Sequence, residues 1–307
     1  MRLAQLSPAE LRASLSGTGL VIPCGPFRIK LNSDIPSLAI DLLQLYGDFP
    51  LLDPEQYVDF EVHLHAPSWL RRYLRPQVVL SCDGRIPFKP LPLAQAFPML
   101  EWGLNWIISS HAHDYLVIHS AVVERDGQAL VLAADPGSGK STLCAALVQQ
   151  GWRLLSDELA LVSLADGRIR PIARPVSLKN ASIGIISALG PDVFVNKACH
   201  DTVKGSVAHM RPPTGSVKDM EKSVAPAVLV FPQYLAGVPM LSKPIGKGTA
   251  FIELTRHTFN FSVLSGDGFE ALGRFLDQVK VSRIQYSSFD QVIPEIDRLW
   301  LTRNDDP

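Results

Sequence analysis

Short runs of alternating hydrophobic and polar residues fill the first third of the chain. An alternation of period two predicts strands at 26–32 and 57–65, and apolar residues at helical spacing predict helices at 35–47 and 94–112. Strands and helices that follow one another irregularly in this way are typical of an α+β unit. We therefore expect a small α+β domain over residues 1–114.

Longer apolar runs begin at residue 115. Two apolar strands joined by a tight turn are expected first, then a helix and a strand at 152–164 that continues past an acidic pair. The segment 200–223 is poor in aliphatic residues and rich in Gly, Pro, Lys and Ser, which predicts a long mobile loop. Further strand-like patterns at 224–234 and 242–254 precede two helices at 269–280 and 288–300. This succession indicates an α/β domain over residues 115–307.

A glycine-rich segment separates the second of these strands from a helix, in the sequence LVLAADPGSGKSTLCAAL. It follows the form G-x-x-x-x-G-K-[ST], in which backbone N–H groups surround a phosphate, the lysine reaches the outer phosphates and the hydroxyl binds Mg²⁺. The start of the helix adds partial positive charge. The alternative is an ordinary glycine-serine turn with an exposed lysine. The residues expected to bind a nucleoside triphosphate are Ala134, which replaces the first glycine, Asp135, Pro136, Gly137, Ser138, Gly139, Lys140, Ser141 and Thr142.

An acidic pair, Asp157 and Glu158, follows the loop after one helix. In a parallel α/β unit the strand after a helix lies beside the strand before it, so we expect these carboxylates beside the phosphates. Phosphoryl transfer needs a metal ion and a residue that orients or deprotonates the nucleophile, and two adjacent acids can share these tasks. The alternative is one turn acid and one exposed acid. His119 interrupts the strand before the loop, and it either faces the same site or is a satisfied core histidine.

Composition and charge exclude several other classes of protein. With 307 residues, of which 47% are hydrophobic and 19% charged, the chain has enough apolar material for ordinary folded cores. The net charge of -1 and the even spread of charges argue against a nucleic-acid binder. The four cysteines form no C-x-x-C pair, which fits a reducing cytoplasm better than a zinc site or a disulfide framework. No apolar run approaches the roughly 20 residues of a membrane span. We therefore expect a cytoplasmic protein.

The segment IHSAVVERDGQALVLAADPGSGKSTLCAALVQQGWRLLSDELALV resembles the core of bacterial HPr kinase/phosphorylase, in which a strand histidine, a hairpin, a GxxGxGKS-type loop and an acidic pair occur in this order. Over nearly the whole chain, motifs such as EWGLNWI, RPVSLKN, TVKGSVAHMRPP and VFPQY resemble the exosortase-associated HPr kinase-related kinase A family. The resemblance implies a phosphoenolpyruvate carboxykinase-like P-loop kinase core preceded by a small α+β domain. It also implies ATP and Mg²⁺ as cofactors, a serine of a small protein or peptide as acceptor, and a peptide chaperone as partner.

Carried onto this sequence, the resemblance assigns Lys140 to the outer phosphates and Ser141 and Glu158 to the metal. Asp157 is the expected base for the substrate hydroxyl, although the assignment of base and metal ligand within the pair stays open, so Asp157 is also a candidate metal ligand. His119 would face the same cavity. Arg211 lies in the expected mobile loop at 200–223, which we interpret as a lid. It is a catalytic candidate because a cationic lid that closes over the phosphates excludes water and adds positive charge there. The alternative for the lid is a solvated surface loop.

Two classes of function follow from these motifs. The first is a kinase that phosphorylates a serine, with a small-molecule kinase as a variant. The second is a nucleotide-binding switch or chaperone-like NTPase that transfers phosphate only to water. A strand histidine together with adjacent acids favours the first class, because a switch NTPase more often keeps a separate water-positioning residue on a loop. The sequence leaves open whether the chain forms a homo-oligomer.

Overall fold

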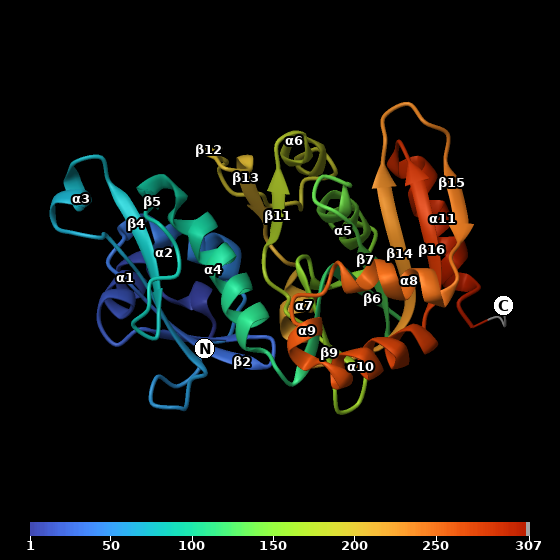
Figure 1. Ribbon diagram of the computed structural model, residues 1–307. Coiled ribbons are helices and arrows are strands. Elements are labelled where there is room, and N and C mark those ends of the chain that lie inside the picture. Colours follow the sequence, from blue (N-terminus) through green and yellow to red (C-terminus); the bar gives the residue numbers. More distant parts are fainter. Residues whose placement is uncertain (305–307) are drawn as a thin grey trace. The chain divides into compact units, whose positions relative to one another are not determined.

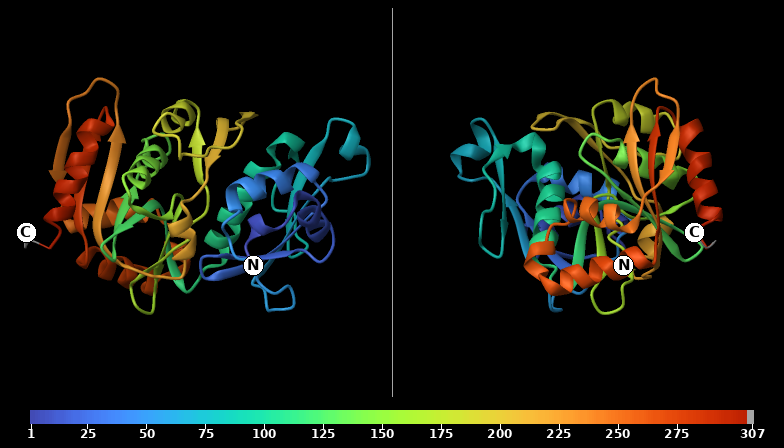
Figure 2. Two further views of the ribbon diagram at one scale, coloured as in Figure 1. Left: turned by 180° about the vertical axis from the view of Figure 1, so that it is seen from behind. Right: turned by 45° about the vertical axis from the view of Figure 1, so that its right-hand side comes forward.

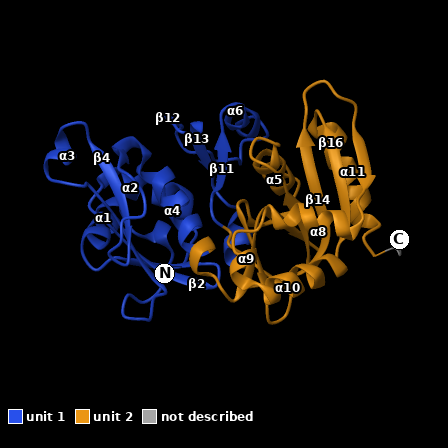
Figure 3. Cartoon of the chain, viewed as in Figure 1, with its two compact units in different colours: residues 1–108, 174–218 blue, residues 109–173, 219–307 orange. Residues whose placement is uncertain are grey.

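The computed structural model describes residues 1–304, and the chain divides into two compact units of mixed α/β structure (Figure 1). Unit 1 consists of Met1–Ile108 and Arg174–Lys218, and unit 2 consists of Ser109–Ala173 and the chain from Asp219 onwards (Figure 3). The α/β class is confirmed. The compact units differ in extent from the two predicted domains, because 174–218 belongs to unit 1; the domains as functional units stay a prediction.

A five-stranded sheet forms the centre of unit 1. Its strands are β1 (Leu20–Cys24), β2 (Phe27–Ser33), β3 (Phe60–His65), β4 (Gln77–Cys82) and β5 (Leu91–Pro92), and they are adjacent in that order. All neighbours are antiparallel except β2 and β3. These two run parallel because a helix between them, α2, returns the chain to the opposite end of the sheet.

The helices of the first 111 residues flank this sheet. They are η1 (Leu3–Gln5), α1 (Pro8–Ser16), α2 (Pro36–Tyr46), α3 (Leu70–Tyr73), η2 (Leu93–Gln95) and α4 (Ala96–His111). The strands and helices predicted here are confirmed, whereas α1 is an addition. It begins with a capping box in which the Ser7 hydroxyl accepts a hydrogen bond from the Glu10 backbone and the Glu10 carboxylate accepts one from the Ser7 backbone.

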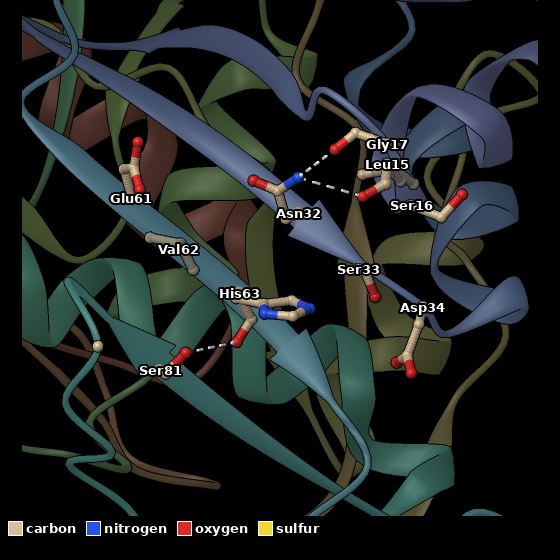
Figure 4. Close-up of a pocket in the computed structure, with 11 residues that line it drawn as sticks. Leu15, Ser16, Gly17, Asn32, Ser33, Asp34, Glu61, Val62, His63 and Ser81 are labelled. Carbon is tan, nitrogen blue, oxygen red and sulfur yellow. Dashed lines mark hydrogen bonds between the residues drawn. The ribbon is translucent and has the colours of Figure 1, made fainter.

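The sheet of unit 1 has one face covered by a helix and one open face. Helix α4 packs so closely that a Cβ on Gly103 would lie 2.2 Å from the Leu80 Cδ1 atom, so a larger residue there would have to displace the buried Leu80 side chain. On the open face, polar side chains including Asn32, His63 and Ser81 line a hollow of about 510 Å³ (Figure 4). The alternation in β2 and β3 therefore separates an apolar face from a polar one.

The segment 174–218 adds a second, three-stranded sheet to unit 1. Its elements are β11 (Val176–Lys179), α6 (Ala181–Ser187), β12 (Cys199–Thr202), β13 (Gly205–Met210) and α7 (Thr214–Lys218), with β13 between β11 and β12. The prediction that 200–223 is a long loop without regular structure is wrong. Two strands and a helix form there because β13 pairs on both edges and buries His209 and Met210, although the segment contains few aliphatic residues.

A buried ion pair attaches this segment to the first part of unit 1. The Arg174 Nη1 atom lies 3.0 Å from the Glu101 Oε2 atom, with 7% and 6% of the two side chains exposed. The Tyr46 hydroxyl also donates a hydrogen bond to Glu101. Burial, followed by the nearby Glu101 charge, raises the pKa of Tyr46. The His209 ring packs edge-on against Phe97 at 5.0 Å. Charge pairing and aromatic packing thus tie 174–218 to helix α4.

An eight-stranded mixed sheet forms the centre of unit 2. Seven strands lie in the order β10-β9-β6-β7-β14-β16-β15, and β8 pairs with β6. Strands β7, β14 and β16 are parallel, and the other pairs are antiparallel. The strands are β6 (Tyr115–Arg125), β7 (Gln128–Ala133), β8 (Arg153–Ser156), β9 (Leu159–Ser163), β10 (Ile169–Arg170), β14 (Ala225–Tyr234), β15 (Leu241–Pro244) and β16 (Lys280–Tyr286).

Helices cover both faces of this sheet (Figures 1 and 2). They are α5 (Lys140–Gln149), α8 (Lys247–Thr255), α9 (Phe261–Leu264), α10 (Gly266–Asp277) and α11 (Phe289–Leu301). On the face of α8 and α10, Leu254, Leu272 and Phe275 pack against Val131 and Leu229 of the central strands. Helices α5 and α11 cover the other face. Within residues 1–304, no helix combines the length and the apolar character needed to cross a bilayer.

Two predictions for the later part of unit 2 need comment. The helices near 269–280 and 288–300 are confirmed as α10 and α11. The strand-like pattern expected at 242–254 is correct only for β15, because α8 follows it directly. Ala250 and Leu254 recur at helical spacing and are buried, so the apolar face that they form outweighs the β-propensity of their neighbours.

Candidate functional site

The glycine-rich segment forms a tight turn between β7 and α5. Gly137 and Gly139 both have φ of +87°, a left-handed conformation that glycine adopts without strain. The first helical hydrogen bond runs from the Leu143 N–H to the Gly139 carbonyl, at 2.9 Å. The N–H groups of the first helical turn therefore have no partner within the helix. An anion can be bound by such groups, because they carry the positive end of the helix dipole.

Lys140 and Asp157 are both buried beside this turn, with 7% and 4% exposed. Cys144, one helical turn after Lys140, is close to the end of β8: its Sγ atom lies 4.0 Å from the Ser156 carbonyl oxygen. Burial raises the pKa of Cys144, the Asp157 charge raises it further and the Lys140 charge lowers it. Both charges thus act on one thiol, and the lysine of the loop and the first acid occupy the same region of unit 2.

The strands that flank the acidic pair occupy a different position in the sheet from the one expected. The prediction that it lies beside β7 is wrong: β8 and β9 pair antiparallel with β6, which lies between them and β7. Asp157 and Glu158 fall between the pairings Val122–Ser156 and His119–Leu159, level with the end of β7. With about 4.8 Å between strands, the acids are roughly 10 Å across the sheet from the start of the loop.

His119 lies on β6 between the loop and the acids. Its Nδ1 atom is 3.7 Å from the Glu158 Oε2 atom, with 25% and 18% of the two side chains exposed. The ring packs edge-on against Phe259 at 5.6 Å, and its backbone N–H donates to the His257 carbonyl at 2.5 Å. The histidine and the second acid therefore lie side by side at one end of neighbouring strands, and both side chains are partly exposed to solvent.

Three residues of this neighbourhood were not among the predicted site residues. His257 follows α8, and burial lowers its pKa while the charge of Asp135 raises it and that of Lys140 lowers it, so it lies beside the loop. Tyr234 and Tyr286 end β14 and β16 next to Gly139. These residues come from segments far from the loop in the sequence, and only the parallel pairing of β7, β14 and β16 brings them together.

Arg211, the remaining predicted site residue, belongs to unit 1. It follows β13, its backbone N–H donates to the Phe194 carbonyl at 3.0 Å, and its guanidinium lies 5.3 Å from the centre of the Phe194 ring. All other predicted site residues lie in unit 2. The role of Arg211 at the phosphates therefore stays a prediction.

Metal ligands were expected at Ser141, Asp157 and Glu158. Within residues 1–304, no group of three or more His, Cys, Asp or Glu side chains is arranged to hold a metal ion. The expected ligand set is not a group of this type, since it consists of two carboxylates and one serine hydroxyl. Oxygen ligands of this type are those that Mg²⁺ prefers, and Mg²⁺ usually keeps several waters and binds substrate phosphates as well.

Comparisons with known proteins give two findings. The family described as SynChlorMet cassette protein ScmC matches residues 97–170, a range that contains the loop and the acidic pair but less than half of the chain. A solved structure of the Hpr(Ser) kinase/phosphatase from Coxiella burnetii is matched with 11% identity over 60% of this chain and 97% of that chain, at a TM-score of 0.26. No curated protein matches. Because of the low identity and TM-score, we base no functional argument on the structural match.

Proposed function

We propose that this protein is an ATP- and Mg²⁺-dependent kinase that transfers the γ-phosphate to a hydroxyl group, that of a serine in a small protein or peptide. The observation that carries the proposal is the common sheet edge of unit 2. There a glycine-rich turn opens helix α5, the loop lysine is buried beside it, a histidine lies one strand away on β6, and two acids lie on the far side of β6.

The turn itself supports binding of a polyphosphate. Gly137 and Gly139 give the backbone the left-handed turns of a phosphate cradle, and the Ser138 Oγ atom is buried with no hydrogen-bond partner in the described part of the chain. A phosphate oxygen would accept a hydrogen bond from this hydroxyl and from the N–H groups at the start of α5. Lys140 would supply the positive charge for the outer phosphates.

The side chains around the turn also suit a divalent cation. Ser141 and Glu158, with Asp157 as the alternative ligand, supply oxygen atoms to the hard ion Mg²⁺. Bound there, the ion would neutralise charge on the β- and γ-phosphate oxygens. The proximity of His119 to Glu158 would hold the carboxylate in one orientation.

Asp157 would act as the base. Its carboxylate accepts the proton of the substrate hydroxyl while the hydroxyl oxygen bonds to the γ-phosphorus. The bond from that phosphorus to the β–γ bridging oxygen breaks, and ADP leaves with the electron pair. Burial supports this role because an acid with 4% exposure is shielded from bulk water, which would compete as the nucleophile. Arg211 would add positive charge when the acceptor is bound.

Transfer of label from γ-labelled ATP tests the proposal. The purified chain is incubated with labelled ATP and Mg²⁺, with and without a serine peptide encoded by a neighbouring gene, and the label is followed into peptide and orthophosphate. Label in the peptide supports the kinase. Label in orthophosphate alone supports the switch or NTPase, and no turnover with any acceptor together with no nucleotide binding contradicts both.

Variants of the acids assign the roles. Asp157→Asn should retain nucleotide and Mg²⁺ binding but lower transfer by roughly 10²- to 10⁴-fold, the usual contribution of a general base. Glu158→Gln should weaken the Mg²⁺ requirement and nucleotide affinity together. Glu270→Gln, at an acid in the same unit whose side chain is 71% exposed, is the matched control and should change neither quantity. Exchanged phenotypes would reverse the two roles.

A further inference from the structure

The two sides of the phosphate loop differ in chemistry. On the side of β6, β8 and β9 lie His119, Asp157 and Glu158; on the opposite side lie β14 and β16. A nucleotide bound in the loop must direct its reacting phosphate towards the acids. Its nucleoside end must then lie on the side away from them, over the carboxyl ends of β14 and β16. These ends are where ligands of parallel α/β sheets bind.

Two aromatic residues end these strands in register. Tyr234 is the last residue of β14, Tyr286 is the last of β16, and the two are paired across the parallel ladder. Their rings meet edge to face, with centres 5.8 Å apart and planes at 69°. Tyr286 is 2% exposed, whereas Tyr234 is 46% exposed. The buried ring thus contacts the partly exposed one, and this contact limits the movement of the exposed ring.

The tyrosines are also joined to the loop. The Tyr234 N–H donates a hydrogen bond to the Ser138 carbonyl at 2.9 Å. A Cβ placed on Gly139 would lie 2.9 Å from the Tyr286 Oη atom and 3.0 Å from the Tyr234 Cβ atom. The exposed ring is therefore positioned by the same turn that forms the phosphate cradle, within the reach of one nucleoside.

The chain that directly follows Tyr234 is apolar and partly exposed. Leu235, Met240 and Leu241, in the chain that follows Tyr234, have exposed fractions of 37%, 36% and 43%. No charged residue occurs between Tyr234 and Leu241 in the sequence. A flat, uncharged group gains most from such a surface, because it stacks on the ring and covers the apolar rim.

We propose that the exposed face of Tyr234 is the nucleobase subsite: the base of a nucleoside triphosphate stacks on this ring while the loop holds its phosphates. The inference rests on the proposed function, since it uses the loop as the phosphate site. Stacking is tolerant of base identity because every base has a π-face. The subsite therefore contributes affinity for a nucleotide over a bare polyphosphate, rather than selection of one base.

Binding of two probes to the full chain tests the inference. A non-hydrolysable ATP analogue and inorganic tripolyphosphate, each with Mg²⁺, are titrated by calorimetry into the wild type, Tyr234→Ala and Tyr234→Phe. Tyr234→Ala should lower the affinity for the ATP analogue about tenfold, which corresponds to about 1.4 kcal/mol. Tyr234→Phe keeps the ring and should bind the analogue as the wild type does. Tripolyphosphate should bind equally to all three.

Each other result has a defined meaning. If Tyr234→Ala binds the analogue as tightly as the wild type, no base stacks on the ring and the inference fails. If Tyr234→Ala loses affinity for tripolyphosphate in the same proportion, the ring only supports the loop, and the inference fails as well. If the wild type binds neither probe, the proposed function fails instead, so the two failures are distinguishable.

Discussion

The two left-handed glycines of the glycine-rich loop allow a matched test of how the loop is held. Gly137 and Gly139 have the same φ of +87°, but their surroundings differ. A Cβ on Gly137 would meet nothing within 4 Å, whereas a Cβ on Gly139 would lie 3.0 Å from the Tyr234 Cβ atom and 2.9 Å from the Tyr286 Oη atom. The variants Gly137→Ala and Gly139→Ala therefore share the backbone cost and differ in the steric cost.

The magnitudes follow from these two contributions. An alanine in the left-handed region costs about 1 kcal/mol relative to glycine, and this is the whole expected effect for Gly137→Ala. Overpacking adds about 1 to 3 kcal/mol for Gly139→Ala. The Tyr234 Cβ atom cannot yield easily, because its backbone is held by the β14 ladder and by the hydrogen bond to Ser138. Gly139→Ala should thus lose about 2 to 4 kcal/mol in total.

Urea titration followed by tryptophan fluorescence measures both losses. Trp152 and Trp300 are buried against each other in unit 2, with ring centres 4.7 Å apart, so they report on the unit that contains the loop. Calorimetric titration then compares the affinity of the two variants for tripolyphosphate. Equal destabilisation by the two substitutions would refute the reasoning, because the tyrosines would then exert no steric constraint on Gly139.

Three further predictions concern other parts of the chain. Arg174→Met removes the cationic partner of the buried Glu101 carboxylate and should lower the free energy of unfolding by about 3 kcal/mol; adding Glu101→Gln should recover part of this loss in urea titrations, and no recovery would contradict a charge effect. Burial lowers the pKa of His257 below 6.5, so its contribution to stability is present above that pH and is lost as the pH falls through the lowered value. His257→Gln should therefore flatten the fall in unfolding free energy between pH 7 and 5, and an unchanged pH dependence would contradict the prediction. Arg211→Ala should lower phosphoryl transfer more than nucleotide affinity in steady-state and binding assays, and equal losses would argue against a role in transfer.

The local elements around the loop could be predicted from the sequence because their determinants are adjacent. Strand β7, the glycine turn and helix α5 form one continuous segment, in which apolar runs, glycines and alanine-rich spacing specify each part. The hairpin before them was predictable for the same reason: Asp126 and Gly127 both adopt positive φ in a two-residue turn, as this dipeptide favours. The run 152–164 likewise forms β8 and β9 along one edge of β6.

The segment 200–223 was misjudged because its order depends on partners elsewhere. Strand β13 is buried between β11 and β12, and His209 packs on Phe97 of helix α4. A histidine counts as polar in a hydrophobicity pattern, whereas here it fills an apolar contact. Pairing on both edges satisfies the backbone hydrogen bonds, which a window of local composition does not register.

The sequence by itself determined the glycine-rich turn, the helix that follows it and the position of the acidic pair in the chain, because each is encoded by neighbouring residues. Only the tertiary structure decided that the acids reach the loop across β6 instead of beside β7, that His257 adjoins Asp135, and that Tyr234 lies against Gly139. The physical reason is that strand order and register are set by the burial of whole faces of the sheet against α5, α8, α10 and α11. That burial sums over residues far apart in the chain, so it brings together side chains whose local sequence carries no sign of their shared position.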